Sequence, residues 1–138
     1  MSSRGFFIGQ VIDDLDAIAS QVRARCKLGQ NDLNRVLEDF FKELLNLTYG
    51  LNLRNLNTER SNEPGLDLGD PTAGARVAYQ VTSQASAKKV NDTLSKITVA
   101  QTGQYDRFYV LIIGERQGSY SLNPTRSRKH GFREANII

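Results

Sequence analysis

The sequence predicts a single α/β domain with a mixed central sheet. The first 50 residues carry two amphipathic helix patterns, and the rest of the chain alternates short strand patterns with one further helix. Residues 108–113 form a run that is apolar on both faces, which is typical of a strand covered from both sides by other elements. A chain of 138 residues is long enough for one domain of this kind.

The spacing of apolar residues predicts two helices near the N-terminus. The first runs from about residue 8 to Gly29, with apolar side chains at 8, 11, 12, 15, 18, 19 and 22. Phe6 and Phe7 precede it. The second begins at an Asn31 N-cap and ends at Gly50, with the same spacing at 33, 36, 37, 40, 41, 44 and 47. We expect the two to form an antiparallel pair, whose surplus apolar surface supports a homodimer or contacts C-terminal domains of a longer protein.

A short strand and a hairpin are predicted to follow. Leucines at 51, 53 and 56 alternate with polar residues and indicate a short exposed strand, followed by polar turn-formers from Asn57 to Glu63. The stretch "GLDLGD" is a second strand that leads through the turn "DPTAGA" into a third, "ARVAYQVTS". The pleat directs Val77, Tyr79 and Val81 to one face of this third strand, and Ala78, Gln80 and Thr82 to the other.

The last core elements are a helix and a strand. From Ser86 a helix directs Ala87, Val90, Leu94 and Ile97 toward the core and leaves Lys88, Lys89 and Lys96 near its borders. The apolar strand that follows is expected in the sheet interior, parallel to the strand before the helix.

The tail of the chain is basic but ends on the apolar sequence Asn-Ile-Ile. We therefore interpret the chain as the N-terminal part of a longer protein. Residues 1–30 would form a helix packed on a domain of residues 31–138.

Composition excludes several classes of protein. The formal net charge of +3 and pI of about 9.2 permit contact with phosphates without requiring it. Cys26 is the single cysteine, so an intramolecular disulfide is excluded and the cytoplasm is favoured. The longest apolar run is far shorter than the roughly 20 residues of a membrane helix, so we expect no membrane contact. No Ser/His/Asp set, phosphate loop or zinc spacing is present, and His130 is expected at the surface.

The residues with the strongest chemical pattern lie on the hairpin. Asp67 on the middle strand and Gln80 and Thr82 on the next would meet at one edge. Mg²⁺ prefers hard oxygen donors, which the Asp67 carboxylate and either the Gln80 amide oxygen or the Val81 carbonyl would supply. Asp70 either adds a second acid or makes the turn.

Each of these residues also has a structural interpretation. Asp67 would then bond main-chain amides in a turn, and Gln80 would belong to a polar network. Thr82 would start the turn into the following helix. Exposed helix positions are the ordinary expectation for the two acids Glu38 and Glu43 and for the two lysines Lys88 and Lys89.

The motifs "PGLDLGD" and "VAYQVTS", followed by a lysine-bearing helix, resemble the PD-(D/E)XK, or restriction-endonuclease-like, nuclease fold. The resemblance covers about residues 31–114 in the order αβββαβ and leaves the N-terminal helix as an addition. In particular, the chain resembles the SMEK-type domains found at the N-termini of larger bacterial proteins, some of which act in antiphage defence.

The resemblance implies roles for individual residues. Asp67 takes the place of the metal-binding aspartate, Gln80 that of the strand acid and Thr82 that of the strand lysine. The helix acid would be Glu38, ahead of Glu43, and Lys88 or Lys89 would replace the strand lysine.

The function implied is cleavage of DNA phosphodiester bonds with Mg²⁺ or Mn²⁺, as the effector of a larger defence protein. DNA would be bound mostly at its phosphates, by Lys88, Lys89 and the segment 126–133. Gln80 is a neutral ligand, however, and Thr82 cannot supply a positive charge. The alternative is a catalytically inactive nuclease-like domain that serves nucleic-acid binding or oligomeric assembly.

Overall fold

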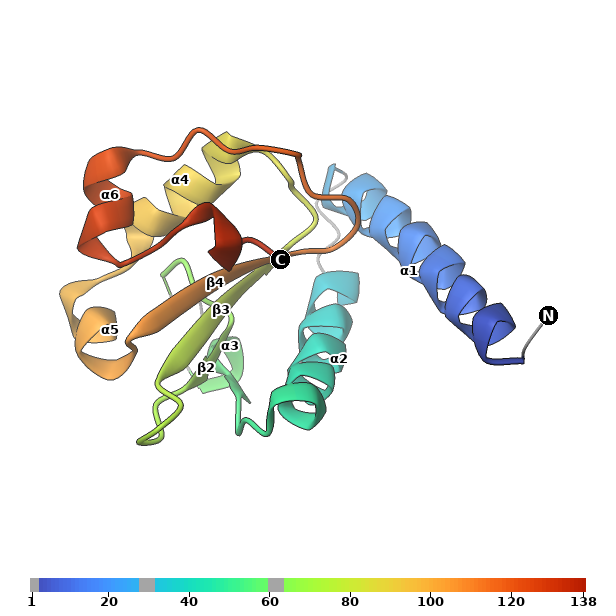
Figure 1. Cartoon of the computed structure of the whole chain (residues 1–138), viewed down its shortest axis with the longest axis horizontal. Coiled ribbons are helices and arrows are strands. Elements are labelled where there is room, and N and C mark those ends of the chain that lie inside the picture. The colour runs from blue at the N-terminus through green and yellow to red at the C-terminus, as the bar shows by residue number, and fades with distance from the viewer. Residues whose placement is uncertain (1–2, 28–31, 60–63) are drawn as a thin grey trace.

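The computed structural model describes residues 3–27, 32–59 and 64–138 as a sheet with helices on both faces (Figure 1). The predicted α/β class and mixed sheet are confirmed. The elements in chain order are α1 (Ser3–Lys27), α2 (Asp32–Tyr49), β1 (Arg54–Asn55), α3 (Leu56–Glu59), β2 (Leu68–Asp70), β3 (Val77–Thr82), α4 (Ala87–Lys96), α5 (Val99–Gln104), β4 (Arg107–Ile112), α6 (Pro124–Lys129) and the 3-10 helix η1 (Glu134–Asn136).

The four strands lie in the order β1-β2-β3-β4. The pairs β1–β2 and β2–β3 are antiparallel, and β3–β4 is parallel. The predicted hairpin is therefore the β2–β3 pair, and the predicted parallel connection is β3–α4–α5–β4. Both predictions are confirmed.

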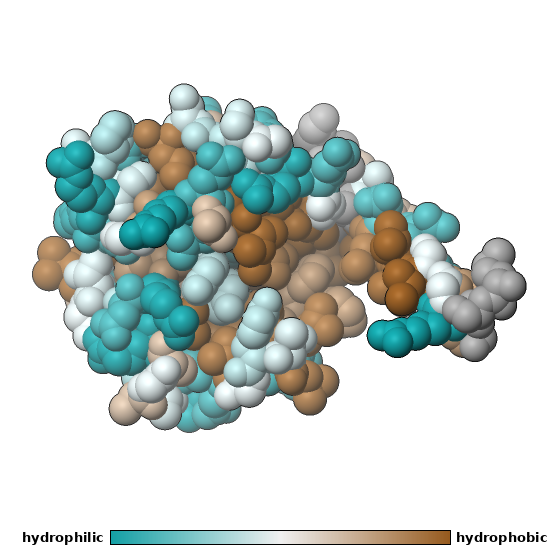
Figure 2. Space-filling view, in the orientation of Figure 1, coloured by the Kyte–Doolittle hydropathy of each residue, from teal (hydrophilic) through white to brown (hydrophobic). Residues whose placement is uncertain are grey.

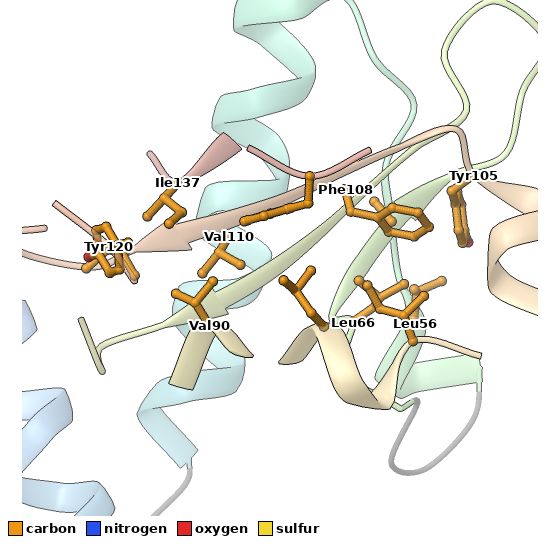
Figure 3. Close-up of a cluster of buried hydrophobic side chains, with 13 residues drawn as sticks. Leu56, Leu66, Val90, Tyr105, Phe108, Val110, Tyr120 and Ile137 are labelled. Atoms are coloured by element: carbon orange, nitrogen blue, oxygen red, sulfur yellow. The ribbon is translucent and has the colours of Figure 1, made fainter. Parts of the chain in front are cut away.

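The sheet separates two clusters of buried side chains. On one face, β3 contributes Ala78 and β4 contributes Val110, which pack with Val90 of α4 (Figure 3). On the other face, Tyr79 of β3 packs with Phe41 of α2. The predicted alternation along β3 and the predicted core face of α4 are both confirmed.

β4 differs from its predicted place, because it is the last strand of the sheet and not an interior one. Both of its faces are buried as expected, and C-terminal residues cover its outer edge. The Ile138 amide donates to the Val110 carbonyl at 2.9 Å, and the Ile112 amide donates to the Ile138 carbonyl at 2.6 Å. A strand apolar on both faces needs cover above and below, but it does not need a strand on each side.

The predicted exposed strand around residues 51–56 is reduced to Arg54–Asn55. Leu53 and Leu56 are buried, and Leu56 begins α3. The two leucines belong to opposite clusters, so this segment anchors both faces of the sheet.

His130 is buried, and its predicted surface position is wrong. It ends the short helix α6, which folds over the cluster formed with α4, and its ring meets Phe108 edge-on at 5.7 Å between ring centroids. Burial, together with the positive charge of Lys129, lowers the pKa of this imidazole. Its neighbours Arg128 and Lys129 are exposed, and for this reason the basic sequence around His130 predicted an exposed position for it as well.

Helix α1 includes Phe6 and Phe7, which were expected to precede it. Of its described side chains, Leu15 and Ile18 pack on the cluster under α2. α1 and α2 run in opposite directions and diverge, so that the N-terminal half of α1 projects from the body (Figure 1). Gly50 follows α2 with φ +65°, as expected of its end. The expected stop at Gly29, the expected cap at Asn31 and the Cys26 side chain lie outside the described residues.

Candidate functional site

Two glycines bring the segment around Asp67 close to its neighbours. Gly65 has φ +69°, and a Cβ there would lie 3.0 Å from the Thr93 carbonyl oxygen of α4. A Cβ on Gly69 would collide with the Tyr105 hydroxyl group. The glycines in "PGLDLGD" therefore allow the strand to approach the helical layer closely on both sides of Asp67.

Asp67 is buried directly before β2, and hydrogen bonds of both its main chain and its side chain hold it in place. Its amide donates to the Tyr79 carbonyl at 2.9 Å, and its carbonyl accepts from the Leu56 amide at 2.8 Å. The Val81 amide donates to its Oδ2 at 2.8 Å, and Asn57 Nδ2 donates to its Oδ1 at 3.0 Å. The side chain thus bonds a main-chain amide, as the turn interpretation required, and also a second side chain.

Glu38 of α2 lies beside Asp67, close enough for each carboxyl group to shift the pKa of the other. Asn57 Nδ2 donates to Glu38 Oε2 at 3.4 Å, and Asn55 Nδ2 donates to the same oxygen at 3.5 Å. Asn57 therefore contacts both acids. Sequence reasoning missed Asn57 and assigned it to a turn; the one signal available was the Asn-Leu-Asn alternation at 55–57.

Burial makes both carboxyl groups harder to ionise, and Asp67 adds to this effect at Glu38. Burial raises the pKa of Glu38 to about 7, and the nearby charge of Asp67 adds to the rise. Burial also raises the pKa of Asp67, against the Val81 amide, the Asn57 amide and the positive charge of Lys89. Below about pH 7 Glu38 therefore keeps its proton.

Neutral oxygen atoms lie next to this pair. The N–H and C=O of one strand residue point to the same side, so the Val81 carbonyl lies on the edge where the Val81 amide meets Asp67. Gln80, which is half-buried, donates from Nε2 to that carbonyl at 3.3 Å. The structure thus brings Glu38, Asp67 and the Val81 main chain together at one edge of the sheet, and Gln80 bonds the Val81 carbonyl.

Thr82 and the two lysines are placed differently. Thr82 is buried, and its Oγ1 accepts from the Gln84 amide at 3.1 Å, which suits the start of the turn toward α4. Lys88 is exposed and its Nζ lies 2.7 Å from Asp92 Oδ2. Lys89 lies close enough to Asp67 to lower the pKa of that carboxyl. Of the two lysines, it is Lys89 whose charge acts on Asp67.

The remaining acids have other partners. Glu43 is exposed on α2, and its Oε1 lies 3.5 Å from Lys42 Nζ. Asp70 is buried and accepts from the amides of Asn52 and Thr72 at 2.8 and 2.9 Å. Burial raises the pKa of Asp70, but hydrogen bonds from Thr72 and Asn52 outweigh it and hold the pKa below its usual value. Asp70 therefore stabilises the turn between β2 and β3.

Among the described residues, no group of three or more His, Cys, Asp and Glu side chains could hold a metal ion. A cation at this edge would therefore be held by two carboxylates and completed by neutral oxygens. A cavity of about 670 Å³ lies against other residues, including Tyr49, Tyr79 and Tyr109, and neither acid of the pair lines it. In the described parts of the chain, no helix is both long and apolar enough to cross a membrane.

Comparison with known families gives one match. The family model of the SMEK domain matches residues 10–138. This match extends beyond the resemblance at residues 31–114, since it includes most of α1 and the C-terminal elements that cover β4. No curated protein and no solved structure matches the chain.

Proposed function

The chain belongs to the SMEK domain family, and from that membership we propose that it is a metal-dependent nuclease domain that cleaves phosphodiester bonds of DNA. The proposal includes a restriction-endonuclease-like core and a place as the effector of a larger bacterial defence protein. The resemblance of the hairpin motifs to that fold supports both parts.

The observation that carries the proposal is the carboxyl pair of Glu38 and Asp67. Two neighbouring carboxyl groups cannot both ionise at low cost, and Glu38, whose pKa is raised to about 7 by burial and by the charge of Asp67, keeps its proton up to about that pH. A divalent cation in place of that proton would compensate both charges. The donors fit Mg²⁺ or Mn²⁺, which bind one or two carboxylates together with neutral oxygens and water.

Each neighbour of the pair has a role in this proposal. Glu38 and Asp67 would hold the cation, with the Val81 carbonyl or the Gln80 amide oxygen as a neutral ligand. When bound, the ion supplies a Lewis acid that polarises a phosphate and lowers the pKa of a water molecule. Asn57 holds both carboxylates in place. Thr82 stands where the resembled fold has a lysine, and Lys89 would supply the positive charge of that lysine instead.

A second candidate function is binding or assembly without cleavage. Gln80 stands where the resembled fold has an acid, and Thr82 stands where it has a lysine. Thr82 is also buried and bonded to the Gln84 amide, so it is not available to a substrate. These two positions favour an inactive nuclease-like domain.

The deciding experiment combines cleavage with metal binding. Plasmid DNA and RNA are incubated with the chain and Mg²⁺ or Mn²⁺, with EDTA as the blank, and metal affinity is measured by calorimetry. Asp67→Asn, which keeps the shape of the side chain, should abolish both cleavage and binding. Glu43→Gln is the matched control on α2, because its side chain is exposed and outside the pair.

Two results would contradict the proposal. If Asp67→Asn, folded by circular dichroism, cuts DNA as fast as the unaltered chain at the same Mg²⁺ concentration, the site assignment is wrong. If neither this chain nor a longer parent protein cuts DNA or RNA, the binding module replaces the nuclease.

A further inference from the structure

The projecting half of α1 carries an apolar face that the rest of the chain leaves exposed. Phe7, Ile8, Val11 and Ile12 recur at helical spacing, and each is more than half exposed. A shallow hollow of about 520 Å³ lies over this face and is lined by these four residues and Arg4. Farther along the same face of the helix, Leu15 and Ile18 pack on the core. The exposed face is thus a continuation of one that is already used for packing.

Helix α2 carries a second exposed apolar stripe. Val36, Phe40, Leu44 and Leu47 follow one another at spacings of four and three residues, with exposed fractions from 44% to 84%. They lie beside the buried core face of the same helix. In Figure 2, apolar surface lies both on the projecting half of α1 and on the part of the body that faces it. We name the two stripes together the α1–α2 surface.

The area of this surface is larger than a monomer usually exposes. Eight large apolar side chains that are each about half exposed or more present roughly 800 Å². The largest apolar patch of a typical monomer is about 300–600 Å². A standard protein interface buries about 800 Å² on each partner, so the α1–α2 surface is by itself sufficient for one.

The charges on α1 indicate which partner would cover this surface. In an antiparallel pair of identical helices, the sequence numbers of two residues that face each other add up to the same value all along the pair. Placing Phe7 opposite Val11 of a second copy therefore places Arg4 opposite the second copy's Asp14. The same contact occurs twice, because a two-fold interface repeats each pair. One register thus joins apolar to apolar and basic to acidic residues.

We infer that the α1–α2 surface is the interface of a homodimer, in which the projecting halves of two α1 helices pack antiparallel and lie against the α2 stripes. The interface is separate from the carboxyl pair. Neither Glu38 nor Asp67 is among its residues, so dimerisation stands or falls independently of nuclease activity.

The test is the molar mass in solution of the 138-residue chain, measured by sedimentation over a range of concentrations. The expected result is a species of twice 15.4 kDa that dissociates on dilution. Val11→Glu should raise the dimer dissociation constant at least about tenfold, because it buries an uncompensated charge. Ala17→Glu is the matched control: this exposed residue lies on the opposite side of α1, and the change should leave the constant within about twofold.

A charge exchange tests the antiparallel register. Arg4→Asp and Asp14→Arg should each weaken the dimer, and the double variant should restore it, because the facing pair is re-formed with reversed signs. A chain that stays monomeric at about 100 μM refutes the dimer, whether or not another protein binds the surface. A dimer that Val11→Glu does not weaken refutes this interface, and a double variant weaker than both single variants refutes the register.

Discussion

Replacing Glu38 with Gln tests whether the acid pair is under repulsion in the folded chain. Glutamine keeps the shape of the side chain and can still donate a hydrogen bond to Asp67, but it cannot ionise. The variant therefore removes the like charge and leaves the packing of α2 against the sheet unchanged.

The sign of the effect follows from the raised pKa of Glu38. Unfolded chains lose this proton near pH 4.5, whereas the folded chain holds it until about pH 7. Between these two values the folded state binds more protons, so the free energy of unfolding falls as pH rises. Below pH 4.5 the group is protonated in both states and contributes no pH dependence.

The size of the effect comes from the same shift. A rise from 4.5 to about 7 corresponds to roughly 3 kcal/mol at about 1.36 kcal/mol per pKa unit. Glu38 is only half-buried, and solvent screening reduces this to about 1–2 kcal/mol. At pH 8, Glu38→Gln should therefore be more stable than the unaltered chain by about 1–2 kcal/mol, and at pH 4.5 the two should be equal.

The assay is urea unfolding followed by circular dichroism, without divalent cations, at several pH values from 4.5 to 8. Glu43→Gln on the same helix serves as the matched control, since its side chain is exposed and lies outside the acid pair. If Glu38→Gln and the unaltered chain keep a constant difference within about 0.5 kcal/mol over this range, the repulsion argument is wrong.

Three further predictions concern the site and its supports. Gln80→Ala should weaken metal-dependent cleavage more than Thr82→Val does, because an amide oxygen can ligate a cation whereas Thr82 only starts a turn. Steady-state cleavage rates of the two variants would show this order, and an equal loss of rate would contradict it. Gly65→Ala should destabilise the chain by at least about 1 kcal/mol in urea unfolding, since φ is +69° and the helix carbonyl is close, whereas Gly118→Ala, with open space around it, should have little effect. DNA affinity should fall as salt rises, and Lys89→Ala should reduce the slope of log affinity against log salt by about 1; salt-independent binding would show that phosphates are not the main contact.

The sequence predicted the elements of the fold well where their pattern depends on one buried face. The apolar face of α2 and the alternating apolar residues of β3 each need only one surface to pack against, and in the structure they pack in the same cluster. The position of β4 was predicted less well. Burial of both faces leaves the hydrogen-bonded edges undetermined, and distant residues, Ile137 and Ile138, occupy the outer edge.

The candidate site shows the same division. The sequence by itself determined that an acid, an amide and a main-chain carbonyl come from two paired strands, because Asp67, Gln80 and Val81 follow from strand alternation and the hairpin. Only the tertiary structure decided that Glu38 and Asn57 join them, since these reach the edge from a helix and a connecting segment whose placement depends on packing. It also decided that the charge near Asp67 is that of Lys89, because α4 begins at Ala87 and its orientation over the sheet follows from the burial of Val90 and Leu94. Local spacing determines which face of an element is buried; the contacts between elements determine which polar groups meet.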